Sequence, residues 1–315
     1  MTSSTSIAPA LGRRRAYWQA AACLAVLMCA AYLALRHWPA LHTGALRLAV
    51  ADQGWLLVGA TAAAATWVSS ALAQQGAVTR PLPGGRLVAA QFAASAANHV
   101  LPAGLGAGAV NVRFLMRCGL PAGRAASALA VKATAGAVAR GALIAALAPA
   151  CPGLLRIPDI PLAALVAVPA AAALVVLLLN SPLWPRCQCA LAAVLADIRA
   201  VHADPRRAAA LWGGSLGFAA LHSLVLIAVT RAVALPLPPV RVALLYLAAS
   251  SAAALLPTPG GLGSLDAALA LALTSSGAPG ATAASVVLGY RLLTVWLPLV
   301  PGLLVLALLI RRKSL

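Results

Sequence analysis

The residues LPAGLGAG at positions 101–108 interrupt one hydrophobic stretch of this chain, and PTPGGLG at positions 257–263 interrupts another. Each interruption precedes a short apolar segment that ends at a Gly-x-Pro sequence, at 119–121 and at 277–279. Proline removes a backbone donor and glycine permits sharp turns, so each motif ends one helix and starts another. Lipid offers no hydrogen bonds to the freed backbone groups, so such breaks persist only inside protein or beside a polar cavity. In transporters, paired breaks in corresponding halves indicate a substrate site.

The composition predicts an all-α, polytopic helical membrane protein. The chain is 63% hydrophobic and 9% charged, with a mean hydropathy of +0.95. Several apolar stretches reach the roughly 20 residues that a helix needs to cross a bilayer. We expect long spans over about 16–35, 48–73, 124–148, 160–180, 208–230 and 280–310. Shorter helices are expected on either side of the breaks, over 87–101, 107–118, 240–256 and 264–276.

The same pattern predicts one transmembrane domain over 16–315, after a disordered cytoplasmic N-terminus over 1–15. Its halves, about 16–181 and 208–310, are joined by a basic segment over 182–207 that contains a candidate interfacial helix. If each break turns a re-entrant hairpin back to its own side, the two hairpins enter from opposite faces, as an inverted repeat requires. If either break is instead a full crossing, this symmetry changes.

The net charge of +18, from 23 basic and 5 acidic residues, has its simplest explanation in membrane topology. In a soluble protein this excess would suggest nucleic acid, but here most charges lie between apolar spans, so no nucleic-acid partner is expected. With a cytoplasmic N-terminus and two re-entrant hairpins, most basic residues lie on the cytoplasmic side, which agrees with the positive-inside rule. We therefore expect a multi-pass protein of the cell membrane that is attracted to anionic lipids.

Each break starts a new helix, whose free N–H groups and positive dipole end suit an anion such as phosphate. Four basic residues could offset the charge of that anion: Arg113, Lys132, Arg140 and Arg291. A charge inside a membrane is a functional hypothesis by default. Arg291 needs a partner, and Asp266 is the nearest acid in its half of the sequence, so we predict an ion pair between them.

Several of the candidate residues also have a structural interpretation. Asp266 can act as a helix cap, and Arg291 can lie at the outer interface with its charge in the headgroup layer. Arg113 can likewise extend to the cytoplasmic headgroups, and Asn98 can form a hydrogen bond between helices.

The motifs of hydrolytic and nucleotide-dependent enzymes are absent from the sequence. There is no H-E-x-x-H, P-loop or G-x-S-x-G motif. The six cysteines form no pattern typical of a disulfide framework or a metal site, and the five histidines are scattered. We therefore expect no enzymatic activity, no metal and no cofactor.

At this point the chain resembles the lysylphosphatidylglycerol synthase transmembrane-region family. The first signature is carried by Asn98, Leu101 to Gly106, Val112 to Leu115 and Gly119-Leu120. The second, more specific one is carried by Pro257 to Leu269, Gly277 and Tyr290 to Pro298. The resemblance implies a flippase-like integral membrane protein. The best-known members move an aminoacylated phospholipid between leaflets and carry a soluble aminoacyl-transferase domain, which we do not expect here because the chain stops at Leu315.

Two positions depart from the pattern of that family. The family commonly has Arg-Glu where this chain has Leu265-Asp266, and the shorter Asp changes the geometry of an acid–arginine pair. The family often has an acid followed by Arg where this chain has Ala139-Arg140, so Arg140 lacks that acidic neighbour.

The sequence therefore predicts a translocase of an anionic phospholipid or another lipid-linked substrate. The alternative is a non-transporting partner or scaffold of a lipid-modifying enzyme or glycosyltransferase, and a small-solute transporter is a weaker third. Alanine-rich helices would also allow a homo-oligomer. The candidate substrate-binding residues come from both motifs and from the charged spans: Asn98, Pro102, Gly104, Gly106, Arg113, Lys132, Arg140, Pro257, Pro259, Gly260, Gly261, Gly263, Asp266, Tyr290 and Arg291.

Overall fold

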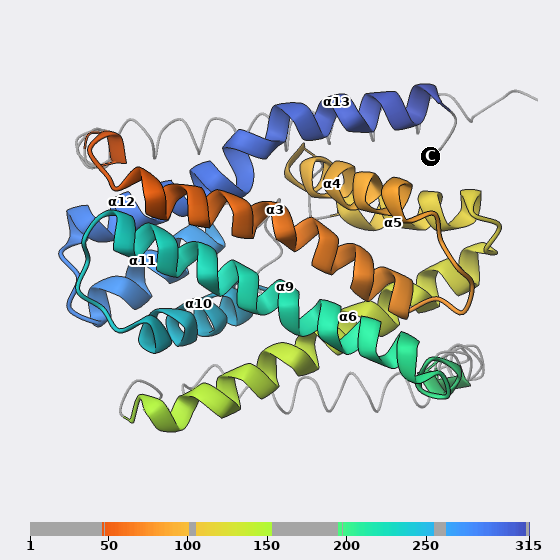
Figure 1. Cartoon of the computed structure of the whole chain (residues 1–315), viewed down its shortest axis with the longest axis horizontal. Coiled ribbons are helices and arrows are strands. Elements are labelled where there is room, and N and C mark those ends of the chain that lie inside the picture. The colour runs from red at the N-terminus through yellow and green to blue at the C-terminus, as the bar shows by residue number, and fades with distance from the viewer. Residues whose placement is uncertain are drawn as a thin grey trace, which may run out of the picture.

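The computed structural model describes residues 46, 48–100, 105–152, 195–196, 198–254, 263–312 and 315. All regular structure in these residues is helical (Figure 1). The elements are α3 (Gln53–Gly76), α4 (Gly84–Val100), α5 (Leu105–Arg117), α6 (Ala122–Leu147), η2 (Ala148–Ala150), α9 (Pro205–Ala232), α10 (Pro239–Ala254), α11 (Ser264–Ser275), α12 (Gly280–Arg291), the π-helical η4 (Leu292–Trp296) and α13 (Leu297–Arg311). This confirms the predicted all-α class.

The helices agree with the expected segments to within a few residues. Four of those in the described residues are long and apolar enough to cross a membrane: Gln53–Gly76, Ala122–Ala150, Pro205–Ala232 and Gly280–Arg311. The expected spans over 16–35 and 160–180 lie outside the described residues, as do residues 101–104 and 255–262, which contain most of the two breaks.

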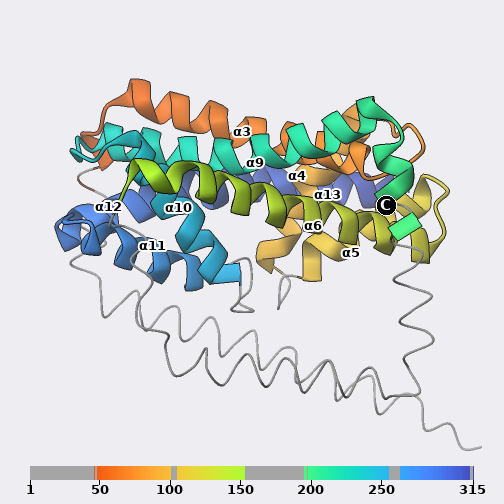
Figure 2. The same ribbon diagram turned by 90° about the horizontal axis from the view of Figure 1, so that it is seen from below.

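The helices on either side of each break are short and pack against each other. Helix α4 contacts α5, and α10 contacts α11. At 1.5 Å per residue, the 13 residues of α5 and the 12 of α11 extend only about 20 Å, well short of a bilayer. Figures 1 and 2 place the α4–α5 pair at one end of the bundle and the α10–α11 pair at the opposite end.

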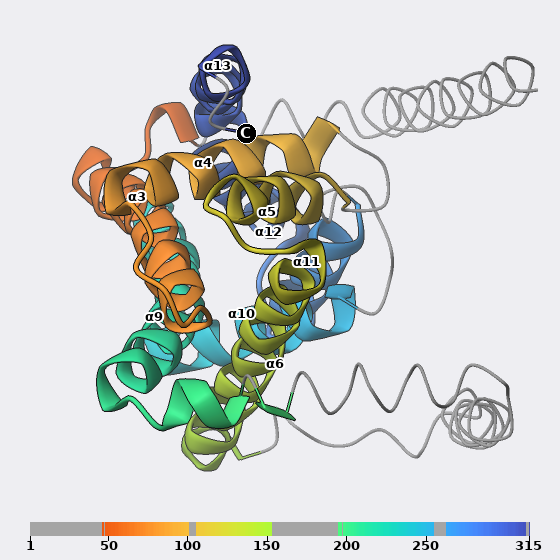
Figure 3. The same ribbon diagram turned by 90° about the vertical axis from the view of Figure 1, so that its right-hand side faces the viewer.

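Helices α3 and α9 form the close-packed antiparallel pair that supports both short pairs. The amide of Asp52, before α3, donates to the carbonyl oxygen of Ala232 at the end of α9, at 3.0 Å. At Gly76 and Gly214 the two backbones approach so closely that an added Cβ atom would collide with the facing helix. Viewed along the bundle in Figure 3, this pair forms one side, and α4, α5 and α6 lie beside it. Small residues thus permit the close packing of α3 against α9, on which the two short helix pairs rest.

Basic side chains gather at one end of the bundle, where α3, α5 and α13 end and α4, α6 and α9 begin. These residues are Arg80, Arg86, Arg117, Arg124, Arg206, Arg207, Arg311 and Arg312. The opposite end, where α9 ends and α10 begins, has Arg231 and Arg241. The described part of the chain is therefore strongly polarised in charge along its long axis.

Candidate functional site

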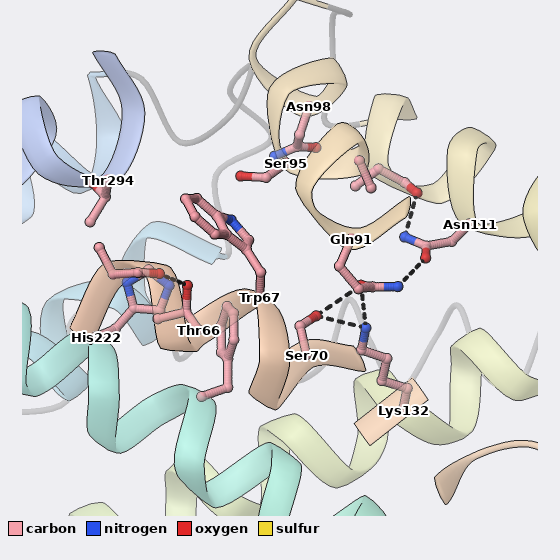
Figure 4. Close-up of a pocket in the computed structure, with 14 residues that line it drawn as sticks. Thr66, Trp67, Ser70, Gln91, Ser95, Asn98, Asn111, Lys132, His222 and Thr294 are labelled. Atoms are coloured by element: carbon pink, nitrogen blue, oxygen red, sulfur yellow. Dashed lines mark hydrogen bonds between the residues drawn. The ribbon is translucent and has the colours of Figure 1, made fainter. Parts of the chain in front are cut away.

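A polar cavity of about 250 Å³ lies between α3, α4, α5, α6, α9 and η4 (Figure 4). Its polar lining consists of Thr66, Ser70, Gln91, Ser95, Asn98, Asn111, Lys132, His222 and Thr294. Two of these, Asn98 on α4 and Lys132 on α6, belong to the residues that the sequence predicted. Asn98 also lies close to the first break in the sequence, as does Ala107, which lines the same cavity from α5.

Lys132 is held in this cavity by neutral groups. Its Nζ donates to Ser70 Oγ and to Gln91 Oε1, each at 2.9 Å. The amide of Gln91 in turn donates to Asn111 Oδ1 at 2.6 Å, and Asn111 donates to the carbonyl oxygen of Ala107 at 2.8 Å. The network joins α3, α4, α5 and α6 around one cation, and no carboxylate belongs to it.

The same cavity contains donors that the described structure leaves unused. An ammonium has three N–H groups, and two of those on Lys132 are occupied. The hydroxyl of Ser95 and the amide of Asn98 line the cavity and make no hydrogen bond within the described residues. Figure 4 shows both side chains at the same side of the cavity, across from Lys132. Within the described residues, Asn98 makes no hydrogen bond to another helix.

A second cavity of about 430 Å³ adjoins the first and shares Ser70, Lys132 and Phe218 with it. Arg140 lines this cavity from α6, two turns after Lys132. The Nε atom of Arg140 is buried and has no hydrogen-bond partner in the described residues. Ala254, the last described residue before the second break, lines the cavity as well. The rest of the lining is mainly small and apolar, contributed by Leu129, Ala133, Gly136, Ala137 and Ala219, with Ser215 and Ala73.

The predicted ion pair between Asp266 and Arg291 is present in the structure. Arg291 Nε donates to Asp266 Oδ1, and the Arg291 side chain is only 7% exposed, so this guanidinium is buried inside the protein. The other carboxylate oxygen, Oδ2, accepts from the Gly263 amide at 2.9 Å. Gly263 begins α11 with a φ of 84°, a conformation that favours glycine. Asp266 is thus both a helix cap and an ion-pair partner, which joins α11 to α12.

A cluster of aromatic side chains lies between this ion pair and the first cavity. Its members are Phe218, His222, Tyr246 and Tyr290. The Tyr290 hydroxyl lies 2.9 Å from His222 Nδ1 and 3.3 Å from the Tyr246 hydroxyl. The rings of His222 and Tyr246 are stacked at 5.9 Å, and Phe218 meets His222 edge-on at 4.6 Å. Arg291 directly follows Tyr290 at the end of α12. Tyr290 and Arg291, predicted from the sequence, therefore lie beside the cavity that His222 lines.

The remaining predicted residues lie apart from the cavities or outside the described structure. Arg113 is exposed on α5 and lines neither cavity. Gly106 packs against α4, where an added Cβ would collide with the carbonyl of Ala97, so its role in the described structure is close helix packing. Outside the described residues lie Pro102, Gly104, Pro257, Pro259, Gly260 and Gly261.

Sequence reasoning missed the neutral residues that hold Lys132, and a signal for them existed. Gln91, Ser95 and Asn98 recur at intervals of four and three residues in α4, and Thr66 and Ser70 are four apart in α3. Such spacing puts polar groups on one face of a helix. In an apolar segment, a polar stripe of this kind indicates an internal cavity.

The chain matches the family model of the lysylphosphatidylglycerol synthase TM region over residues 19–302. It belongs to this family. The resemblance inferred from the two signatures is thereby confirmed. The match covers both breaks, both cavities and the Asp266–Arg291 pair. A comparison with curated proteins finds no match. The protein is therefore a helical membrane protein of the lysylphosphatidylglycerol synthase TM family.

Proposed function

We propose that this protein is a flippase-like translocase of a lipid with an anionic headgroup. The observation that carries the proposal is that two adjoining cavities share Lys132 and that each is lined by a residue close to one of the two breaks, Asn98 or Ala254. The headgroup would occupy these cavities while the acyl chains stay in lipid. Arginine and lysine side chains inside a membrane are costly unless they serve such a ligand or pathway.

The placement of the short helix pairs supports alternating access. We propose that α4–α5 and α10–α11 are re-entrant hairpins that reach the cavities from opposite faces, as related halves of an inverted repeat at about 16–181 and 208–310. The proposed substrate residues are those near the cavities together with the glycines and prolines of the breaks. Rocking of one half against the other would expose Lys132 to each leaflet in turn.

The charge distribution supports an orientation. We propose that the basic end of the bundle is cytoplasmic, because short cytoplasmic loops carry an excess of Lys and Arg. Helix α3 begins at the opposite end, so the span expected from the sequence over about 16–35 would place the N-terminus in the cytoplasm. The same basic end would attract anionic lipids at the inner leaflet of the cell membrane.

A leaflet assay tests the proposal. The full chain is reconstituted in vesicles that contain fluorescent phosphatidylglycerol, and a membrane-impermeant reductant reports the lipid exposed outside. We expect faster exchange than in empty vesicles. Lys132→Met should slow it by about tenfold or more, because charge-assisted hydrogen bonds are worth about 1.5–3 kcal/mol. Arg231→Met, at an exposed site away from the cavities, should leave the rate unchanged.

Equal exchange in empty and protein-containing vesicles, with several anionic lipids and with folded protein, would contradict translocation. A scaffold for a lipid-modifying enzyme or glycosyltransferase would give that result, and would co-purify with its enzyme from native membranes.

A further inference from the structure

The charges around the two cavities are of one sign. Among the described residues that line either cavity, only Lys132 and Arg140 carry a formal charge, and both are positive. No described carboxylate lines either cavity, and Asp266 is paired with Arg291. The two cavities together therefore carry two positive charges, and no residue of opposite charge lines either cavity within the described residues.

We infer that the headgroup is a terminal phosphate with two negative charges, a phosphomonoester on an apolar anchor. This assignment rests on the proposed function only in taking the cavities as the site of a lipid headgroup. A phosphomonoester carries close to two negative charges near neutral pH and has three terminal acceptor oxygens. A phosphodiester such as phosphatidylglycerol carries one, and an aminoacylated headgroup brings a positive charge of its own.

The unused donors are of the kind that a phosphate accepts. In the first cavity they are the third N–H of Lys132, the hydroxyl of Ser95 and the amide of Asn98. A terminal phosphate accepts hydrogen bonds from donors of each of these kinds. In the second cavity, which shares Lys132 with the first, the unpartnered Nε–H of Arg140 adds the second charge. A neutral or cationic headgroup would leave both cations uncompensated.

Partial burial strengthens the charge match, because Lys132 and Arg140 are each largely enclosed within the described residues. An unpaired charge in a low-dielectric site is costly, and an opposite charge within reach offsets that cost. A singly charged headgroup compensates one of the two cations and leaves the other. The small residues Ala133, Gly136, Ala137 and Ala219 along the second cavity leave space for the first atoms of an apolar anchor. Both a diacylglycerol and an isoprenyl chain provide such an anchor, so the shared chemistry is the terminal phosphate.

Lipid binding to the purified full chain in detergent tests the inference without any transport. The probes are short-chain phosphatidic acid, farnesyl phosphate, phosphatidylglycerol, phosphatidylcholine and lysyl-phosphatidylglycerol, with inorganic phosphate as the anchor-free control, all at pH 7. We expect at least one of the two phosphomonoesters to bind about tenfold or more tightly than phosphatidylglycerol, and lysyl-phosphatidylglycerol to bind weakest. The tighter of the two phosphomonoesters identifies the anchor.

Substitutions of the two cations test whether they cause the preference for a phosphomonoester. Lys132→Met and Arg140→Met should each reduce the preference for phosphomonoester over phosphodiester to about twofold or less, while Arg231→Met keeps it. Equal affinity of the wild-type chain for phosphatidic acid, farnesyl phosphate and phosphatidylglycerol, or tightest binding of the lysyl lipid, would overturn the inference whatever the variants do. If the order of lipids holds but no leaflet exchange occurs, translocation fails and the headgroup assignment stands. If phosphatidylglycerol exchanges rapidly and no phosphomonoester is preferred, the reverse applies.

Discussion

The two halves of this molecule each enclose a cation, Arg291 fully and Lys132 in part, and they hold it in different ways. Arg291 is paired with the carboxylate of Asp266, whereas Lys132 is held by the hydroxyl of Ser70 and the amide of Gln91. The first arrangement is neutral as it stands. The second keeps its positive charge and directs it at a cavity. The difference separates a cation that stabilises helix packing from one that is available to a ligand.

The largest effect is expected from removing the carboxylate. Asp266→Ala leaves Arg291 buried without its partner and removes the cap of α11, so we expect a loss of about 3–5 kcal/mol of stability. Thermal unfolding in detergent measures it. Asp204→Ala is the matched control, because its pair with Arg207 is solvent-exposed and it also caps a helix. Similar losses at both sites would remove the distinction between a buried pair and a surface pair.

The second prediction concerns the cation without a carboxylate. Lys132→Met should weaken binding of an anionic lipid about tenfold to a hundredfold, with a change in thermal stability far smaller than that of Asp266→Ala. Lys132→Arg keeps the charge and should retain part of the binding. A variant that unfolds as readily as Asp266→Ala, with unchanged lipid affinity in the folded fraction, would show that Lys132 is structural.

The third prediction tests the support of the lysine network. Gly106→Ala places a methyl group against the Ala97 carbonyl and must separate α5 from α4, across which Gln91 bonds Asn111. We expect a loss of about 1–3 kcal/mol of stability, typical of overpacking, together with weaker lipid binding. Gly108→Ala in the same helix meets no atom and is the control. Equal behaviour of the two variants would contradict the close approach of α4 and α5.

The smallest effect on stability is expected in the aromatic cluster around Tyr290. Tyr290→Phe removes the hydrogen bonds to His222 and Tyr246 while preserving the ring, so we expect a loss of about 0.5–1.5 kcal/mol. Thermal unfolding in detergent measures this loss, with Tyr246→Phe as a second variant for comparison. No measurable change in either variant would mean that the buried hydroxyls find other partners.

The helices and one tertiary contact were predictable from the sequence because their signals are local or unique. The lengths of the apolar segments give α3 and α9 directly, and Asp266 was the only acid near Arg291 in its half of the sequence. The partners of Lys132 were not predictable, because Ser70 and Gln91 are distant in sequence and neither is charged. Neutral hydrogen-bonding residues meet through helix packing, which composition does not encode.

The most direct test is a cryo-electron microscopy structure of the full chain in a nanodisc that contains phosphatidic acid. The account predicts headgroup density in the polar cavity, with phosphate oxygens within hydrogen-bond distance of Lys132 Nζ and of Asn98 or Ser95. Lipid density confined to the outer surface, with both cavities closed by side chains, would contradict it.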